Sequence, residues 1–239
     1  MLIDRLNSLL VEADRLWSEA AERTRPGEIV CRTGCFGCCI GVFQISLPEA
    51  LVARAAVATL PEAERGLILG AARRIVAEGA SLFPGDAHLG VLDPGRSEAV
   101  DDRYFETTAN TVCPMLALPS GRCRIYAARP VTCRTYGLAW ARSGKPAAPA
   151  CMLNFPDAPG RRRDASIDLD RLVEADQRAA EELLAAGFPA GAETTLAHAL
   201  VGSAFGEFEG RLTARRSRRG GPRVPPSAPV RDRFRRGPG

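Results

Sequence analysis

The chain is poor in histidine and lysine. It has two histidines, His88 and His198, and Lys145 is the only lysine among its 32 basic residues. A metal site built on imidazoles, or a catalytic triad with a histidine base, therefore has almost no residues to use. Abundant arginine and alanine are typical of a biased genomic composition, so arginine richness alone is weak evidence for nucleic-acid binding.

Long apolar runs are also missing. The longest candidate, residues 196–205, is shorter than the roughly 18–20 residues that span a bilayer, and it contains His198. Charged side chains, among them Asp4, Arg5 and Glu12, stand where a secretory signal would have its apolar region. We therefore expect a cytoplasmic protein without a transmembrane segment, in a compartment where disulfides rarely persist.

Cysteine is the one reactive residue type that the chain concentrates. Four cysteines lie within residues 31–39 and four more follow within residues 113–151; they are Cys31, Cys35, Cys38, Cys39, Cys113, Cys123, Cys133 and Cys151. Crowded thiolates repel one another unless a metal holds them, and glycine-rich loops let the backbone wrap around an ion. The sequence predicts that these eight cysteines ligate zinc or iron, the iron as an ion or an iron–sulfur cluster, since both metals accept thiolates.

The adjacent pair Cys38-Cys39 constrains the arrangement. Neighbouring side chains diverge, so both reach one tetrahedral ion only with strain, and the pair indicates either two metals or one cysteine that is not a ligand. Arginines beside the cysteines are predicted to offset the negative charge of the thiolates. They are Arg32, Arg122, Arg124, Arg129 and Arg134.

These motifs resemble those of the YkgJ-like cysteine-cluster family, described as zinc- or iron-chelating proteins. The resemblance covers residues 31–151 and is carried by three features: the window 31–39 followed by Ile-Ser-Leu-Pro-Glu at 45–49, the segments 113–116 and 121–126, and the segment 129–136 followed by Cys151. It implies cytoplasmic, bacterial metal or iron–sulfur binding through all eight cysteines. The first gap is C-x3-C, where many members have C-x2-C.

Two other functions stay open. Cys31, Cys35 and Cys38 match the C-x3-C-x2-C triplet of radical SAM enzymes, although the chain lacks the alternating strand–helix pattern of their barrel. Flagellin lysine methylases carry a similar cysteine cluster, which keeps an iron–sulfur-dependent modifying enzyme of the SAM-type methyltransferase kind as an alternative. The segment 213–239 has nine arginines and one aspartate, which predicts a disordered basic tail that could hold nucleic acid or another polyanion.

The expected fold is mainly α, with helices around an irregular, loop-rich cysteine core at 31–151. We expect one helical domain over residues 1–212, whose outer helices could engage a protein partner. Paired capping boxes at 46–49 and 59–62 predict two helix starts. The predicted helices are 1–22, 47–58, 61–79, a short one from Pro130 to near Gly137 that carries Cys133, 166–186 and 191–212; segments 80–112 and 143–159 are predicted to be irregular.

Overall fold

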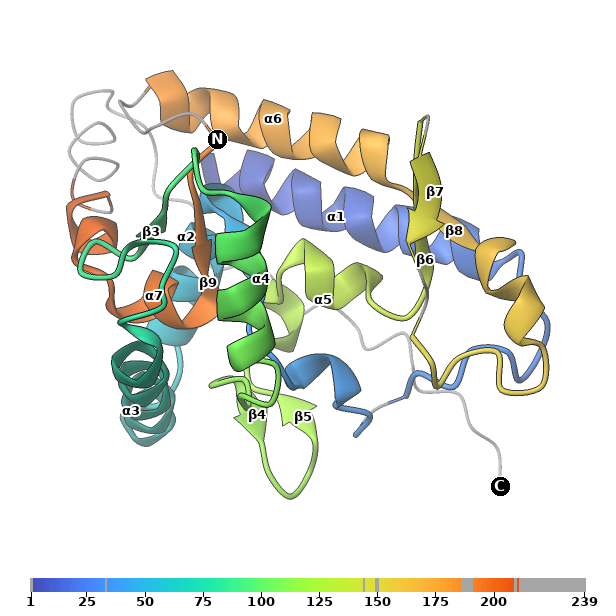
Figure 1. Cartoon of the computed structure of the whole chain (residues 1–239), viewed down its shortest axis with the longest axis horizontal. Helices are drawn as coiled ribbons and strands as arrows, with labels where there is room; N and C mark the ends of the chain where they lie inside the picture. The colour runs from blue at the N-terminus through green and yellow to red at the C-terminus, as the bar shows by residue number, and fades with distance from the viewer. Residues whose placement is uncertain are drawn as a thin grey trace.

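The fold is mainly α, as the sequence predicts. The structure is a computed structural model that describes residues 2–32, 34–143, 145–148, 151–185, 191–208 and 210. Its α-helices are α1 (Leu2–Ala21), α2 (Leu47–Ala58), α3 (Glu62–Gly79), α4 (Glu98–Thr107), α5 (Val131–Thr135), α6 (Leu169–Ala185) and α7 (Leu196–Val201) (Figure 1). Three short 3-10 helices accompany them: η1 (Gly37–Cys39), η2 (Tyr126–Ala128) and η3 (Pro159–Arg163). None of the described helices is long and apolar enough to cross a membrane.

The strands are short; some pair within local hairpins, and others join segments that lie far apart in the sequence. They are β1 (Gln44–Ser46), β2 (Gly85–Asp86), β3 (Val91–Leu92), β4 (Leu116–Ala117), β5 (Arg122–Cys123), β6 (Ala139–Arg142), β7 (Lys145–Ala148), β8 (Ser166–Asp168) and β9 (Glu193–Thr195). β1 pairs with β9 in antiparallel fashion, β2 with β3, and β4 with β5, while β6 pairs with β7 on one side and with parallel β8 on the other.

Two apolar clusters organise the helices. The larger one gathers residues of α2, α3, α6 and α7, and it includes Ile45, Ile68 and Phe205. The smaller one lies between α1, β6 and β8, where Leu16 and Ile167 are buried. α1 and α6 run alongside each other across the top of Figure 1. The cysteine-bearing elements η1, β5 and α5 therefore sit on a scaffold of packed helices.

Local sequence signals explain the start of α2. Ser46 is its N-cap, with an extended backbone, and its N–H donates to Glu49 Oε2 at 2.7 Å. Pro48 sits in the first turn, where its missing N–H costs nothing. The second predicted capping box is wrong: Pro61 is the N-cap of α3 and makes no side-chain cap bond, and Thr59 Oγ1 instead donates to the Ala56 carbonyl.

Four of the segment predictions are also wrong in part. The stretch 80–112, predicted to be irregular, contains α4 and the β2–β3 hairpin. Glu98 and Asp101 make the first turn of α4 acidic, which favours a helix start there, and Tyr104 anchors that helix in the core. The stretch 143–159 contains β7, which pairs with β6. The helix predicted from 166 begins instead as strand β8, and strand β9 precedes the helix predicted from 191. α7 ends at Val201, with Gly202 as its C-cap, before a further helical stretch at 203–208.

The basic tail predicted at 213–239 lies outside the described residues, as do the ends of the helices predicted to reach 186 and 212. The division into a domain of 1–212 and a tail stays a prediction.

Candidate metal centre

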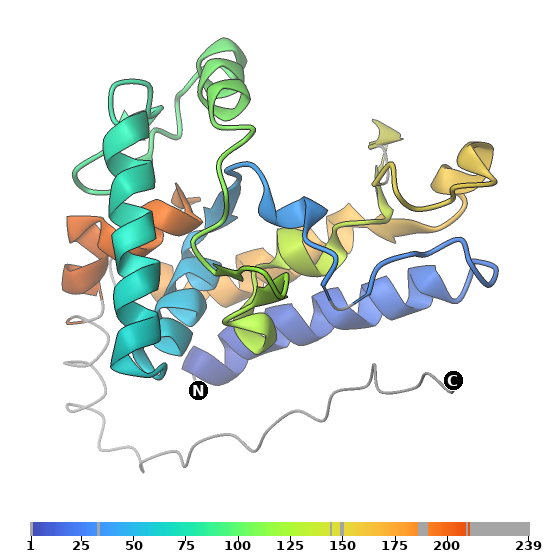
Figure 2. The same cartoon turned by 90° about the horizontal axis from the view of Figure 1, so that it is seen from below.

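Backbone contacts join the two cysteine-bearing segments. The N–H of Cys113 donates to the carbonyl of Cys39 at 2.8 Å, and Ile40 and Val112 form an isolated antiparallel bridge. The loop with η1 therefore lies beside the segment that leads into β4, and η1 and α5 are neighbours in both views (Figure 2). The structure thus brings the first cysteine window against the second.

The β4–β5 hairpin places Cys123 near Cys113. Leu116 is the register partner of Cys123, and its N–H donates to the Cys113 carbonyl at 3.1 Å. Both cysteines pack against the larger apolar cluster. The hairpin also touches the first loop, because a Cβ built on Gly121 would lie 2.6 Å from the carbonyl oxygen of Gly34. Only glycine at position 121 allows the two backbones to approach this closely.

Cys133 is held by the short helix α5, which is fixed at both ends. At its start, the Val131 N–H donates to Glu49 Oε1 at 2.6 Å. At its end, the buried Arg134 pairs with Asp14 of α1, and its Nε donates to the carbonyl of Arg129 at 2.9 Å. Each contact satisfies a buried polar group, so the position of Cys133 is tied to α1 and α2.

Asn154 links two further cysteines, Cys31 and Cys151. Its side chain is fully buried; Oδ1 accepts from the Val30 N–H at 3.0 Å, and Nδ2 donates to the Gly137 carbonyl at 2.7 Å and lies 3.5 Å from Cys31 Sγ. Its N–H donates to the Cys151 carbonyl at 3.0 Å. Through its side chain and its backbone, this one residue thus connects the loops of Cys31 and Cys151 to the end of α5.

Burial and mutual repulsion raise the pKa of most of these thiols. Burial raises the pKa of Cys113 to about 12 and that of Cys133 well above its usual value, and neighbouring thiols add to both shifts. For Cys31, burial raises the pKa, the Asn154 bond lowers it, and Cys35, Cys151 and Cys38 raise it further. Thiols that resist ionisation in this way are good ligands only when a cation replaces their protons.

The Cys38-Cys39 pair differs from the others. The hydrogen bond between the two thiols lowers the pKa of Cys38 and raises that of Cys39, so the pair loses its first proton easily and its second with difficulty. Burial opposes this shift, whereas the backbone of Cys38 and the positive charge of Arg129 also lower the pKa of Cys38 and favour its thiolate. A thiolate at Cys38 is an anionic ligand that is available near neutral pH.

Arg129 stands out among the arginines predicted to offset the thiolate charge. Its guanidinium lies over the Tyr126 ring at 4.1 Å, and its charge acts on Cys38, Cys123 and Cys133. Within the described part of the chain, its buried Nε has no hydrogen-bond partner. Arg134 also acts on Cys123, whereas Arg124 pairs with Glu64 at 3.5 Å.

The donor set fits zinc or iron in kind, although its geometry is not yet that of a ligand shell. All eight cysteines are free thiols, and each of them except Cys31 is only partly exposed. Among the described residues, no three His, Cys, Asp or Glu side chains are already arranged to hold one ion. Metal binding would therefore require side chains of neighbouring cysteines to turn toward a common point.

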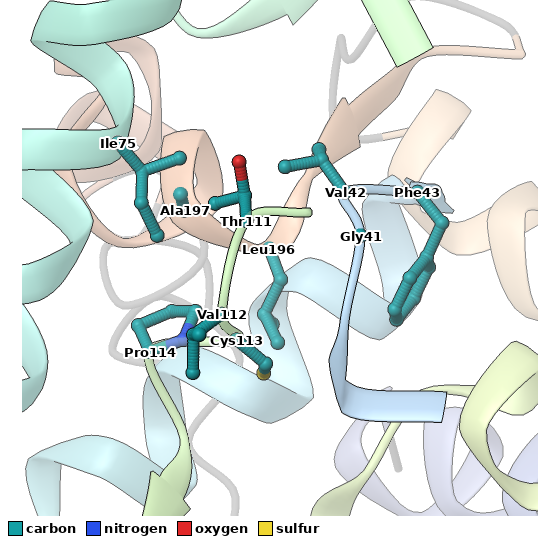
Figure 3. Close-up of a pocket in the computed structure, with 10 residues that line it drawn as sticks. All are labelled: Gly41, Val42, Phe43, Ile75, Thr111, Val112, Cys113, Pro114, Leu196 and Ala197. Carbon is teal, nitrogen blue, oxygen red and sulfur yellow. The ribbon is translucent and has the colours of Figure 1, made fainter. Parts of the chain in front are cut away.

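Two cavities lie beside the cysteines. A small apolar one is enclosed by α3, α7 and the segments 41–43 and 111–114, and Figure 3 shows Cys113 as the one sulfur on its wall. One thiol cannot hold an ion, so this cavity is a packing gap behind the site. The other cavity, of about 170 Å³, is lined by Cys38, Cys133 and Tyr136, among others, and reaches the thiols directly.

Sequence reasoning missed Asn154 and Glu49 as supports of the site. Glu49 was recognised only as a capping residue, and nothing near Asn154 signals that its amide meets Cys31. The two histidines play no part among the thiols. His198 is buried, stacks on Phe83 with ring centroids 3.8 Å apart, and shares a hydrogen bond between its Nδ1 and Thr195 Oγ1 at 2.9 Å.

Comparison with known proteins supplies a family. Searches of the curated proteins and of the solved structures gave no match. A family model, CxxCxxCC, matches residues 30–152, which is more than half of the chain and contains all eight cysteines. The chain therefore belongs to the CxxCxxCC family, whose description is "putative zinc- or iron-chelating domain".

Proposed function

We propose that the protein binds zinc or iron through thiolates of residues 31–39 and 113–151. The observation that carries this proposal is the contact between the two segments: the Cys113 N–H to Cys39 carbonyl bond brings cysteines together that are 74 positions apart (113 − 39). These cysteines form no disulfides, and burial and neighbouring thiols raise the pKa values of Cys113 and Cys133. A bound cation would stabilise such thiols in the ionised form by replacing their protons. All eight cysteines are proposed as ligands.

The proposed role of the metal is structural or sensory. Contacts that fix the thiols also hold α1, α2 and α5 together, as Glu49 and Arg134 show. Because the ligands are supplied by segments distant in sequence, metal binding free energy becomes part of the folding free energy. We expect chelators to lower stability and metal content together.

The test is elemental analysis of anaerobically purified native protein, with an optical spectrum of the same sample. We expect zinc or iron to co-purify. Visible charge-transfer absorption would assign an iron–sulfur cluster and favour the modifying-enzyme alternative, and a colourless zinc-loaded protein would exclude that alternative. Wild-type protein that contains neither metal, and takes up neither when reduced, would contradict the proposed function.

A variant pair tests the role of the thiols. Cys133→Ser should lower both metal content and the free energy of unfolding, because Cys133 lies on a helix tied to α1 and α2. Met152→Ser is the matched control: it also removes a sulfur from the cysteine region, but the side chain is a thioether that is 72% exposed. Full metal content in Cys133→Ser would show that this cysteine is not a ligand.

A further inference from the structure

We propose that the cavity beside Cys38 and Cys133 binds a small neutral molecule with one aromatic ring and a hydroxyl group, and that this molecule covers the two thiols. The cavity measures about 170 Å³ and lies between the segment 38–43 and residues 132–136 at α5. Binding of the molecule is argued from the cavity itself, whereas its effect on metal release rests on the proposed function.

The size of the cavity fits a single ring. An engineered apolar cavity of about 150 Å³ in another protein binds one benzene molecule. Ile40 and Tyr136 belong to the wall and are 37% and 43% exposed, so the cavity opens to solvent beside them. A free molecule the size of phenol therefore fits the cavity and has a way in from the surface.

One wall of the cavity is apolar. It is formed by Ile40, Val42 and Phe43, and the last two also pack against the larger apolar cluster, so the protein core supports this wall. Cys38 and Cys133 add two sulfur atoms, which are soft and polarisable and pack well against aromatic rings. These contacts favour an aromatic body for the bound molecule.

The opposite wall carries hydroxyl groups. Thr132 and Tyr136 stand one helical turn apart, at positions i and i+4, and each brings a hydroxyl that both donates and accepts hydrogen bonds. None of the described residues that line the cavity is an Arg, Lys, His, Asp or Glu. A carboxylate or an ammonium group would lose its hydration there without gaining an ion-pair partner. The lining therefore favours a neutral molecule with one hydroxyl.

Backbone and side-chain contacts hold the cavity open between two anchored segments. On one side, the Gly41 N–H donates to the Thr111 carbonyl at 2.8 Å. On the other, the Val131 N–H at the start of α5 donates to Glu49 Oε1 at 2.6 Å. The cavity is thus largely formed before a ligand enters, as small-molecule sites usually are.

The position of the cavity gives the bound molecule a role at the metal centre. Cys38 and Cys133 belong to different cysteine segments and line the same cavity, so one molecule contacts both. While it is bound, it stands between these two thiols and the solvent that enters beside Ile40 and Tyr136. We therefore expect it to slow the attack of a chelator on metal held by these thiols.

The experiment titrates reduced, zinc-loaded, full-length protein with phenol under anaerobic conditions and measures binding by calorimetry. Phenol should bind once per chain. Toluene, which lacks the hydroxyl, should bind about tenfold more weakly, and the charged probes benzoate and benzylamine should bind more weakly still. Zinc release to a chromogenic chelator should slow in proportion to the phenol occupancy measured by calorimetry.

A variant pair places the site in this cavity. Thr132→Phe fills the cavity and removes a hydroxyl, so it should weaken phenol binding by about tenfold or more. Thr59→Phe is the matched control, because Thr59 is an exposed residue at the end of α2 and does not line the cavity. It should bind phenol as wild type does. If Thr132→Phe fails to fold, the comparison of probes on wild type decides.

Five outcomes would overturn the proposal. They are no binding of phenol, binding of toluene as tight as that of phenol, tighter binding of a charged probe, zinc release that is unchanged at saturating phenol, and phenol binding that Thr132→Phe leaves intact. Tighter binding of N-acetyltyrosinamide than of phenol would replace the free molecule by a tyrosine side chain of a partner protein. Wild-type protein that takes up no zinc would instead overturn the proposed function, while the phenol titration would still test the cavity.

Discussion

Gly121 offers a sharp test of the contact between the two halves of the site. It lies in the turn between β4 and β5 with φ +68°, and a Cβ there would meet the backbone of Gly34 at 2.6 Å from the oxygen and 2.9 Å from Cα. Gly34 stands in the first cysteine window, between Cys31 and Cys35. A Gly121→Ala change therefore pushes the first window away from the hairpin that carries Cys123.

The size of the effect follows from two terms. An alanine with left-handed φ costs roughly 1–2 kcal/mol, and a clash with backbone that cannot rotate away costs about 1–3 kcal/mol. We expect Gly121→Ala to lower the free energy of unfolding by about 2–5 kcal/mol in total, and to lower Tm by at least about 4 °C. If about 2 kcal/mol of this strain persists in the metal-bound state, metal affinity falls about thirtyfold.

Gly66→Ala is the matched control. Gly66 lies in α3, and apart from its chain neighbours and its own helix backbone, no atom of the described residues stands within 4 Å of a Cβ built on it. The same substitution there should raise stability by roughly 0.5–1 kcal/mol, because alanine is the better helix former, and should leave metal affinity unchanged. Thermal unfolding and competition with a chelator give both quantities. An unchanged chelator competition curve for Gly121→Ala would refute the idea that this contact sets the geometry of the metal centre.

Three further predictions concern buried polar groups. Asn154→Ala should lower the free energy of unfolding by about 2–4 kcal/mol, because it leaves the Val30 N–H and the Gly137 carbonyl without a partner. The same change should speed metal loss in a chelator assay, and equal loss rates would contradict the role of Asn154 at Cys31. Burial lowers the pKa of His198 from 6.5 to about 4, so the unfolded chain binds the proton more readily and the free energy of unfolding should fall as pH drops below about 6.5. By pH 5 the wild type should have lost about 2 kcal/mol relative to His198→Gln, as measured by urea unfolding. Parallel pH profiles of the two proteins would refute this prediction. Burial raises the pKa of Glu49 from 4.5 to about 7, so the contribution of this carboxyl group to the free energy of unfolding is fully present below about pH 4.5 and is lost as pH rises through 7. The stability of Glu49→Gln relative to wild type should therefore increase by up to about 3 kcal/mol over that range. A constant difference between the two proteins would show that Glu49 does not titrate there.

Helices with strong local signals could be predicted from the sequence. The bounds of α2 are those predicted, because Ser46, Pro48 and Glu49 are all helix-start signals and lie within four consecutive residues. The same pattern failed at Thr59, where the helix starts after Pro61 and the hydroxyl turns back to α2. A capping-box pattern indicates which hydrogen bonds a segment could form, and the contacts of the preceding helix determine which of them does form.

The short strands β1 and β8 could not be predicted, because their partners are remote. β1 is three residues long and pairs with β9, with Gln44 opposite Thr195. Three residues carry almost no alternation of apolar and polar side chains, so the signal of such a strand lies in a partner about 150 positions away in the sequence. The same holds for β8, which the sequence alone assigns to the helix that follows it.

The sequence predicts which residue type would bind the metal, and it does not predict how the cysteines are arranged. Eight thiols and no competing histidine cluster identify the chemistry from the sequence. Which thiols lie together depends on contacts that no local pattern encodes, such as the Cys113 N–H to Cys39 carbonyl bond and the amide of Asn154 against Cys31. The sequence suggested several arginines as charge partners, and only packing distinguishes Arg129, whose Nε is left unpartnered, from Arg124, which pairs with Glu64.

The two parts of the candidate site differ in how firmly they are held: α5 with Cys133 is tied to the helical scaffold, and the loop of residues 31–39 is held by fewer contacts. Cys133 is fixed through Glu49 and Arg134, whose partners belong to the helical scaffold. The loop of residues 31–39 contacts the second cysteine segment through few backbone hydrogen bonds, and its Cys38 lines a cavity of about 170 Å³ together with Cys133 of α5. Since no three described His, Cys, Asp or Glu side chains are arranged for one ion, we expect this loop to move if metal binds as proposed. Metal binding should then protect amides of residues 34–40 from hydrogen exchange more than those of α5, and equal protection would place the adjustment elsewhere.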